Sequence, residues 1–162
     1  MIQNRDAVGS SPARDLALDC VEAGIRAADP ERAVRDAVAV DDDTLHVGDV
    51  SYDLAAYDDV LVVGAGKGVV GLARGLETRL GDRLSGGVVV SEAAADLERV
   101  EVLVGDHPVP SERGVAAAER VRMLVELADE RTLLLAAFTG GGSALLTLPA
   151  EDVSLADLQA TT

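Results

Sequence analysis

Lysine occurs once in this 162-residue sequence, at Lys67, within the glycine-rich segment 64–68. An apolar run at 60–63 precedes the segment and a helical pattern of apolar residues follows it, so Lys67 is expected at a strand-to-helix turn. Backbone N–H groups and the helix dipole favour an anion at such a turn, and an ammonium group strengthens that preference. The pattern predicts that Lys67, with Gly64 and Gly66, binds a phosphate or a carboxylate. The alternative is an exposed residue at a helix start.

This first glycine loop matches neither of the two common nucleotide-binding patterns in full. A Walker loop has four residues between its glycines and Ser or Thr after the lysine, whereas Gly68 follows Lys67. The dinucleotide pattern needs a third glycine where Val69 stands, although Glu92 could take the place of the ribose-binding acid. Neither ATP binding nor NAD binding follows from this loop alone.

A second glycine run directly follows the apolar strand expected to end at Phe138. It consists of Gly140, Gly141 and Gly142, and Ser143 comes next. Successive glycines allow N–H groups to form a concave anion-binding nest, to which a serine hydroxyl can add. An open α/β sheet binds its ligand at the carboxyl ends of its strands, where both loops are expected. Either run alone is typical of a tight turn, but together they predict a site.

His107 is the third candidate, in a loop that contains two prolines. Pro108 follows it and restricts its backbone to extended conformations. A structural loop residue and a ligand-binding residue are both open interpretations. His46 is expected on the surface of a hairpin, and neither histidine lies in a metal-ligand spacing, so the metal-binding residues stay unknown.

The charge balance excludes several classes of partner. Asp and Glu number 29 against 14 Lys and Arg, giving a formal net charge of −15. Such a surface repels nucleic acids and anionic membranes. Acidic residues spread along the chain, with almost no lysine, predict a halophilic protein, because salt screens their repulsion. A mesophilic acidic protein is the alternative.

The cellular location is predicted from cysteine and from the absence of long apolar segments. Cys20 is the only cysteine, so the chain can form no internal disulfide. The first residues lack the apolar core of a signal peptide, and no apolar run approaches the roughly 18 residues of a membrane span. We therefore expect a soluble, cytoplasmic protein.

The apolar periodicity predicts two parts, a lead-in over residues 1–58 and an α/β domain over residues 59–162. The lead-in reads as a helix at 12–28 with an apolar stripe, a short helix at about 31–38, and a two-stranded β-hairpin at 45–52. The α/β part alternates strands with helices, with strands at 60–63, 87–90, 100–104 and 132–138. This is the pattern of a Rossmann-like, doubly wound, mostly parallel sheet with helices on both faces. Ser154 is expected to cap a last helix that the sequence interrupts after two turns, with a frayed tail as the alternative.

Three segments together carry a specific resemblance. Segments 62–67, 105–110 and 140–145, in this order and spacing, resemble the N-terminal domain of the glycerate 2-kinase family of the MOFRL type, whose members are often labelled hydroxypyruvate reductase. The leading helix, the hairpin and the closing segment 149–159 are similar too, so the resemblance covers nearly the whole chain.

The resemblance implies ATP- and Mg²⁺-dependent phosphorylation of D-glycerate to 2-phosphoglycerate, in a cleft between this domain and a C-terminal domain. It implies a catalytic role for Lys67, and places His107 and the loop at 140–143 where substrate or phosphate binds. Thr139 and Gly68 depart from the family, which more often has serine and alanine there. The second domain is not in this sequence, so we expect an N-terminal fragment that is inactive alone. The alternatives are a non-enzymatic anion-binding half-domain that works in trans and an NAD(P)-dependent hydroxypyruvate reductase.

Overall fold

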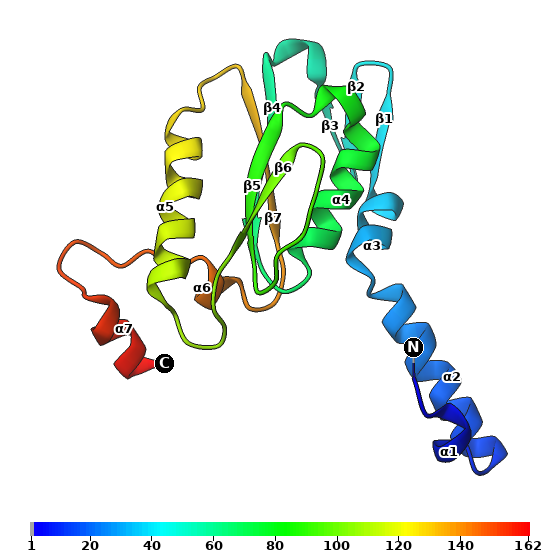
Figure 1. The fold of residues 1–162 in the computed structure, drawn as a ribbon. Helices are drawn as coiled ribbons and strands as arrows, with labels where there is room; N and C mark the ends of the chain where they lie inside the picture. Colours follow the sequence, from blue (N-terminus) through cyan, green and yellow to red (C-terminus); the bar gives the residue numbers. More distant parts are fainter. Residues whose placement is uncertain (1) are drawn as a thin grey trace.

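A four-stranded parallel sheet forms the centre of the computed structural model, which describes residues 2–162 (Figure 1). Its strands lie in the order β6-β5-β4-β7, with β4 and β5 in the interior of the sheet. Their bounds are β4 (Asp59–Ala65), β5 (Gly86–Ser91), β6 (Val100–Val104) and β7 (Thr132–Phe138). All the strands run in one direction, so their C-terminal ends meet at one side of the sheet, which we call the carboxyl edge. The predicted parallel sheet is confirmed.

Helices cover both faces of the sheet and enclose two apolar clusters. One face carries α3 (Pro30–Ala37) and α4 (Val69–Leu80); the other carries α5 (Glu112–Glu126) and the short α6 (Gly142–Leu145). Side chains alternate between the faces along each strand, so Val62 packs in the first cluster and Val63 in the second. The crossovers through α4 and α5 thus give the doubly wound arrangement that the sequence predicts.

The expected two-stranded hairpin is present, as two strands of a separate antiparallel sheet that has three. This sheet consists of β1 (Val38–Asp41), β2 (Thr44–Val47) and β3 (Val50–Asp53), followed by a 3₁₀ turn at Leu54–Ala56. Helix α3, which was expected at about 31–38, ends at Ala37, because Val38 leaves the helix to pair with Val47. Leu45 is fully buried in the same cluster as α4, so this sheet shares its core with the parallel one.

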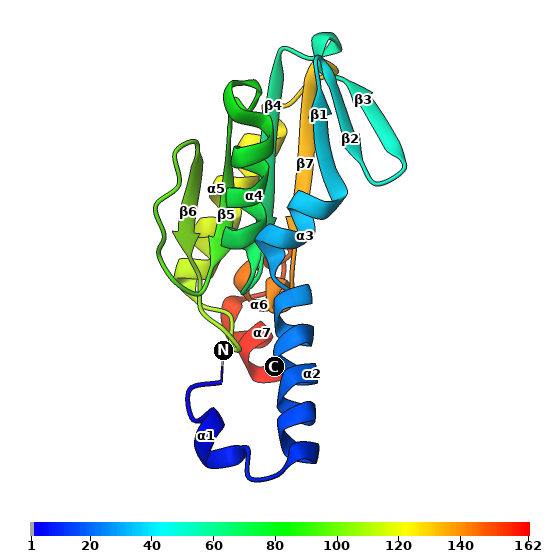
Figure 2. The same cartoon turned by 90° about the vertical axis from the view of Figure 1, so that its right-hand side faces the viewer.

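The first two helices extend beyond the carboxyl edge (Figure 2). These are α1 (Arg5–Val8) and α2 (Pro12–Ala27), and Ser11 caps α2 by accepting the Arg14 N–H. No residue of α2 is buried, and Leu16 and Ile25 are 65% and 54% exposed. The predicted helix is confirmed, and its apolar stripe is not covered within residues 2–162.

The last helix, α7 (Leu155–Thr161), also lies beyond the carboxyl edge, on the side of α5 (Figure 1). The predicted capping box is present: Ser154 Oγ accepts the Asp157 N–H, and the Asp157 carboxylate accepts the Ser154 N–H. The Gln159 side chain donates to the Pro110 carbonyl at 2.8 Å, which ties α7 to the His-Pro loop. Over residues 2–162, no helix is both long and apolar enough to cross a membrane.

Candidate anion-binding site

The first glycine loop connects β4 to α4 and lies directly against the loop that follows β7. Gly66 has φ +136°, and a Cβ built there would lie 2.1 Å from Thr139 Oγ1. A Cβ at Gly64 would lie 1.8 Å from the Ala137 carbonyl oxygen. Both positions therefore require glycine, because a side chain at 64 would force β4 away from β7 and one at 66 would force the two loops apart.

The backbone N–H groups of the first loop donate to protein acceptors. The Gly66 N–H donates to the Val90 carbonyl at 3.0 Å, and the Lys67 N–H donates to the Gly140 carbonyl at 2.9 Å. The Gly68 N–H donates to Thr139 Oγ1 at 2.9 Å. What this loop presents to an anion is thus the Lys67 side chain, which is 51% exposed. The predicted ligand-binding role of Gly64 and Gly66 stays a prediction, and their packing role is established by the contacts above.

The second glycine loop keeps several N–H groups available. Gly141 adopts φ +92° and precedes α6, and the Gly142 N–H donates back to the Thr139 carbonyl at 3.3 Å. Among residues 2–162, no hydrogen-bond acceptor is found for the N–H groups of Gly140, Gly141 or Ser143. Successive N–H groups around a left-handed residue form the concave arrangement that binds anions.

The structure brings the three predicted motifs together around Gly141. A Cβ built on Gly141 would lie 3.1 Å from His107 Cδ2 and 3.3 Å from Lys67 Cγ. Lys67, His107 and Ser143 are all exposed, so an anion can reach this point from solvent. The stem of the Lys67 side chain and the His107 imidazole therefore both lie against Gly141, in a loop with free N–H groups.

Glu92 is a further residue of this site, placed at the end of β5. Its Oε2 lies 3.9 Å from Lys67 Nζ, and its side chain is 48% exposed. The sequence offers one signal for this placement: Glu92 is the first residue after the strand that neighbours β4. Its significance for the site was not predicted, apart from the comparison with a ribose-binding acid.

The His-Pro loop is attached to both the sheet and α5. The Gly105 N–H donates to the Ser91 carbonyl at 2.8 Å, and the peptide bond between His107 and Pro108 is cis. Asp106 accepts a hydrogen bond from Ser111 Oγ at 2.5 Å and pairs with Arg113. The Ser111 hydrogen bond, followed by the Arg113 contact, lowers the pKa of Asp106 below its ordinary value. Asp106, which the sequence analysis missed, therefore positions His107 relative to α5.

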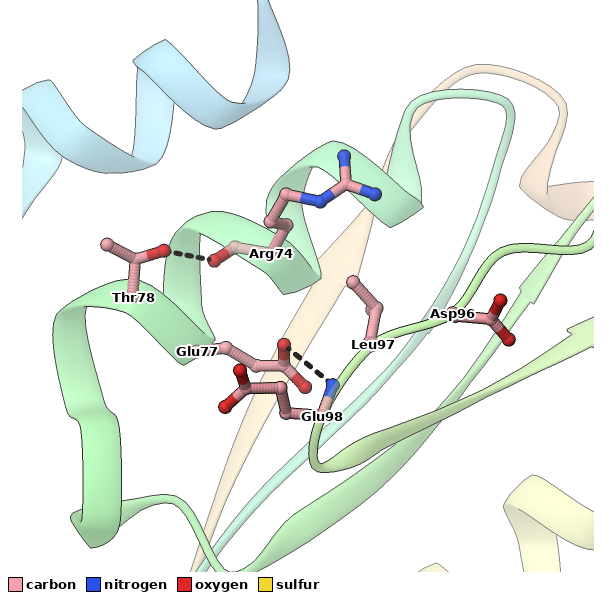
Figure 3. A pocket seen from close by; sticks show the side chains of 6 residues that line it. All are labelled: Arg74, Glu77, Thr78, Asp96, Leu97 and Glu98. Carbon is pink, nitrogen blue, oxygen red and sulfur yellow. Dashed lines mark hydrogen bonds between the residues drawn. The ribbon is translucent and has the colours of Figure 1, made fainter.

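A hollow of about 530 Å³ lies elsewhere on the molecule, between α4 and the connection from β5 to β6 (Figure 3). Its lining comes from residues 74–78 of α4 and from residues 96–98, whereas Lys67 precedes the first turn of α4. The Glu77 carboxylate accepts hydrogen bonds from the N–H groups of Glu98, Arg99 and Val100. Its hydrogen bonds therefore fix the segment that leads into β6. Within the part of the chain that the structure describes, three or more His, Cys, Asp or Glu side chains nowhere gather as a metal site.

Comparisons with known proteins identify the family of this chain. Residues 16–162 match a family model described as a domain of unknown function, DUF4147. A protein named glycerate 2-kinase from Pyrococcus horikoshii is 35% identical over 151 residues, which is 92% of this chain and 33% of that protein. A protein named putative hydroxypyruvate reductase from Agrobacterium vitis is 37% identical over 102 residues, 62% of this chain and 26% of that protein.

Solved structures give the same result. A crystal structure of a protein from Pyrococcus horikoshii has a TM-score of 0.81 and 34% identity, covering 94% of this chain and 34% of that one. The crystal structure of glycerate kinase from Thermotoga maritima has a TM-score of 0.70 and 30% identity, covering 90% and 33%. The chain thus spans about a third of the length of the relatives it matches.

Proposed function

The chain belongs to the DUF4147 family as the N-terminal domain of glycerate 2-kinases, and from this premise we propose that it supplies the anion-binding part of such an enzyme. The full enzyme would transfer the γ-phosphoryl group of ATP to the 2-hydroxyl of D-glycerate. The convergence of Lys67, His107 and the loop around Gly141 on one open position carries this proposal. D-Glycerate is a carboxylate and its product carries a phosphate, and both anions suit these groups.

Each part of the site has a role in the proposal. The ammonium of Lys67 offsets the charge of the substrate carboxylate or of the transferring phosphoryl group. The N–H groups of Gly140, Gly141 and Ser143 donate to anionic oxygens, and His107 covers one side of the loop. These groups bind and orient the anion, and binding in a fixed position is the main contribution that a protein makes to phosphoryl transfer.

ATP and Mg²⁺ enter the proposal only through the family resemblance. Mg²⁺ prefers carboxylate and phosphate oxygens in octahedral geometry. Residues 2–162 bring no group of three or more His, Cys, Asp or Glu side chains together, so they do not form a protein-built site for this ion. No step proposed for this chain runs through the metal.

We also propose that catalysis requires protein groups beyond residues 1–162. Phosphoryl transfer needs charge stabilisation on both the attacking and the leaving side. The site described above is open to solvent on one side, and the matched relatives are about three times as long as this chain. The 162-residue chain should therefore bind the anion without ATP-dependent turnover. Phosphorylation of D-glycerate by this chain alone would contradict the requirement.

A binding experiment tests the site directly. We expect D-glycerate, followed by ¹⁵N NMR, to shift the amide signals of Gly140, Gly141 and Ser143, whereas uncharged glycerol leaves them unchanged. Lys67→Gln should weaken the binding that these shifts report, and Lys67→Arg should retain more of it because it keeps the positive charge. Equal shifts with glycerol, or undiminished binding by Lys67→Gln, would overturn the proposal.

The reductase alternative has one observation in its favour, the name of the Agrobacterium relative. Dinucleotide binding uses a third glycine for close packing between helix and strand. Here that place holds Val69, which is fully buried. We therefore favour the kinase, and NADH titrated against the same amide signals separates the two functions: specific shifts at the first glycine loop would support the reductase.

A further inference from the structure

We propose that Glu92 is a positioning residue of this site, a built-in counter-ion that holds the Lys67 ammonium while no anion is bound and competes with the anion for it. The nature of the natural anion rests on the function proposed above. The role of Glu92 itself rests on the geometry of the two side chains.

The placement of Glu92 is fixed by the backbone on both sides of the pair. In the register of β4 with β5, Ala65 lies opposite Val90, two residues before Glu92. The Gly66 N–H donates to the Val90 carbonyl at 3.0 Å, so the loop that carries Lys67 is bonded to the end of β5. The two side chains therefore emerge from adjoining points of the carboxyl edge.

Lys67 and Glu92 are close enough to attract each other, and both side chains are exposed enough to separate. Glu92 Oε2 lies 3.9 Å from Lys67 Nζ, and the side chains are 48% and 51% exposed. Within residues 2–162, Glu92 is the only carboxylate within 4.0 Å of that ammonium. Exposed pairs of this kind contribute little to stability. A conformational role is therefore the stronger interpretation: Glu92 limits where the flexible lysine side chain points.

An incoming anion changes the electrostatics of the pair. Lys67 Cγ and His107 both lie against Gly141, and the lysine side chain is half exposed, so its flexible end can bring the ammonium to an anion bound at the second loop. The Glu92 carboxylate then repels the anion while it attracts the same cation. Binding must therefore loosen the contact between Lys67 and Glu92, and Glu92 reduces the affinity of the site for anions.

Glu92→Gln tests this competition, with Glu130→Gln as the matched control. Glu130 is exposed and lies just before β7, at the opposite edge of the sheet, so both substitutions change the net charge equally. The probes are inorganic phosphate and D-glycerate, titrated separately at about 0.15 M salt. We expect Glu92→Gln to bind phosphate about two- to fivefold more tightly than Glu130→Gln, the range of an exposed ion pair. The difference should shrink at about 1 M salt, where the screening length is about 3 Å.

A double variant separates competition from a general structural effect. In the Lys67→Gln background, Glu92→Gln should bind phosphate no more tightly than Glu130→Gln does, because the ammonium for which Glu92 competes is gone. Equal affinities of Glu92→Gln and Glu130→Gln in the parent chain, or weaker binding by Glu92→Gln, would overturn the inference. If D-glycerate fails to bind to every variant while the phosphate difference persists, the proposed substrate is wrong and the role of Glu92 stands.

Discussion

Thr139 and Gly68 form a hydrogen bond between the two glycine loops and lie in close contact. The Gly68 N–H donates to Thr139 Oγ1 at 2.9 Å, and a Cβ at residue 68 would lie 3.3 Å from the Thr139 methyl group. Thr139 supplies the hydroxyl acceptor, and its methyl group takes space that an alanine at 68 would need. Pro30 Cγ, at 2.9 Å, is the nearer obstacle to a Cβ at residue 68, so Thr139 and Pro30 together limit this position.

The hydroxyl of Thr139 should matter more than its methyl group. Thr139→Val removes the acceptor of the Gly68 N–H and leaves that donor unpaired at a half-buried position, which costs about 1–3 kcal/mol. Thr139→Ser keeps the acceptor and should remain within about 0.5 kcal/mol of the parent. Urea denaturation of both variants measures the difference. Similar midpoints for the two variants would show that the hydrogen bond does not hold the loops together.

Adjacent glycines of the second loop should respond differently to the same substitution. Gly141→Ala places a side chain at φ +92° and within 3.1 Å of the His107 ring, so we expect a loss of about 1–3 kcal/mol and weaker phosphate binding. Gly140→Ala is the control, because no atom lies within 4 Å of its built Cβ and its φ is not positive. That variant should keep its stability within about 0.5 kcal/mol. Thermal unfolding and phosphate titration of the two proteins decide the matter, and equal losses would exclude a special role for Gly141.

Acid should remove the stabilisation that Asp106 provides to the His-Pro loop. The hydrogen bond from Ser111, then Arg113, lowers the pKa of Asp106 below its ordinary value of 3.8. A group with a lowered folded-state pKa stabilises the fold above its unfolded pKa and loses that effect as the pH falls through the folded value. Asp106→Asn should therefore melt below the parent at neutral pH, and the gap should close as the pH falls below 3.8.

The effect of Asp106 is measured by the difference in melting temperature between the parent and Asp106→Asn at each pH. Asp58 and Asp157 also have lowered pKa values, through Arg131 and Ser154 respectively, so the parent loses stability in acid for several reasons. Those contributions are the same in parent and variant and cancel in the gap. A gap that stays constant from neutral pH to well below pH 3.8 would show that the Asp106 carboxylate is not the cause.

The alternation of strands and helices over residues 59–162 was predictable because the sequence signals for these elements are local. Apolar runs bounded by glycines mark β4, β5 and β7, and the carboxyl ends of parallel strands must share an edge. That rule alone brings Lys67 and the loop around Gly141 to one side of the sheet. His107 joins them because its loop follows β6, the edge strand next to β5.

What the sequence missed depends on contacts between distant segments. A valine at position 38 suits either the end of a helix or a strand. Its pairing with Val47 places it in β1. The apolar stripe of α2 predicts a covering partner, but periodicity does not say where that partner lies. Glu92 is one of 29 acidic residues, and only the register of β5 against β4 distinguishes it.

Glu77 fixes the start of β6, where no helix connects that strand to β5. Its carboxylate accepts the N–H groups of Glu98, Arg99 and Val100 at 3.2, 2.7 and 2.9 Å, respectively. Figure 3 shows the first of these hydrogen bonds. Glu77→Gln exchanges one acceptor oxygen for an NH₂ group that faces these donors, and we expect a loss of about 1–2 kcal/mol. Glu98→Gln removes the same charge from the lining of the same hollow, but leaves all three hydrogen bonds in place.

Hydrogen exchange localises the effect of Glu77 more directly than global stability does. In Glu77→Gln the amides of residues 98–104 should exchange faster, because the entry into β6 opens locally, while β4 in the interior of the sheet keeps its protection. Since the His-Pro loop follows β6, the same opening should reach His107 and weaken phosphate binding. Unchanged exchange over 98–104 in Glu77→Gln, or equally fast exchange in Glu98→Gln, would mean that the loss of the carboxylate hydrogen bonds does not control this strand.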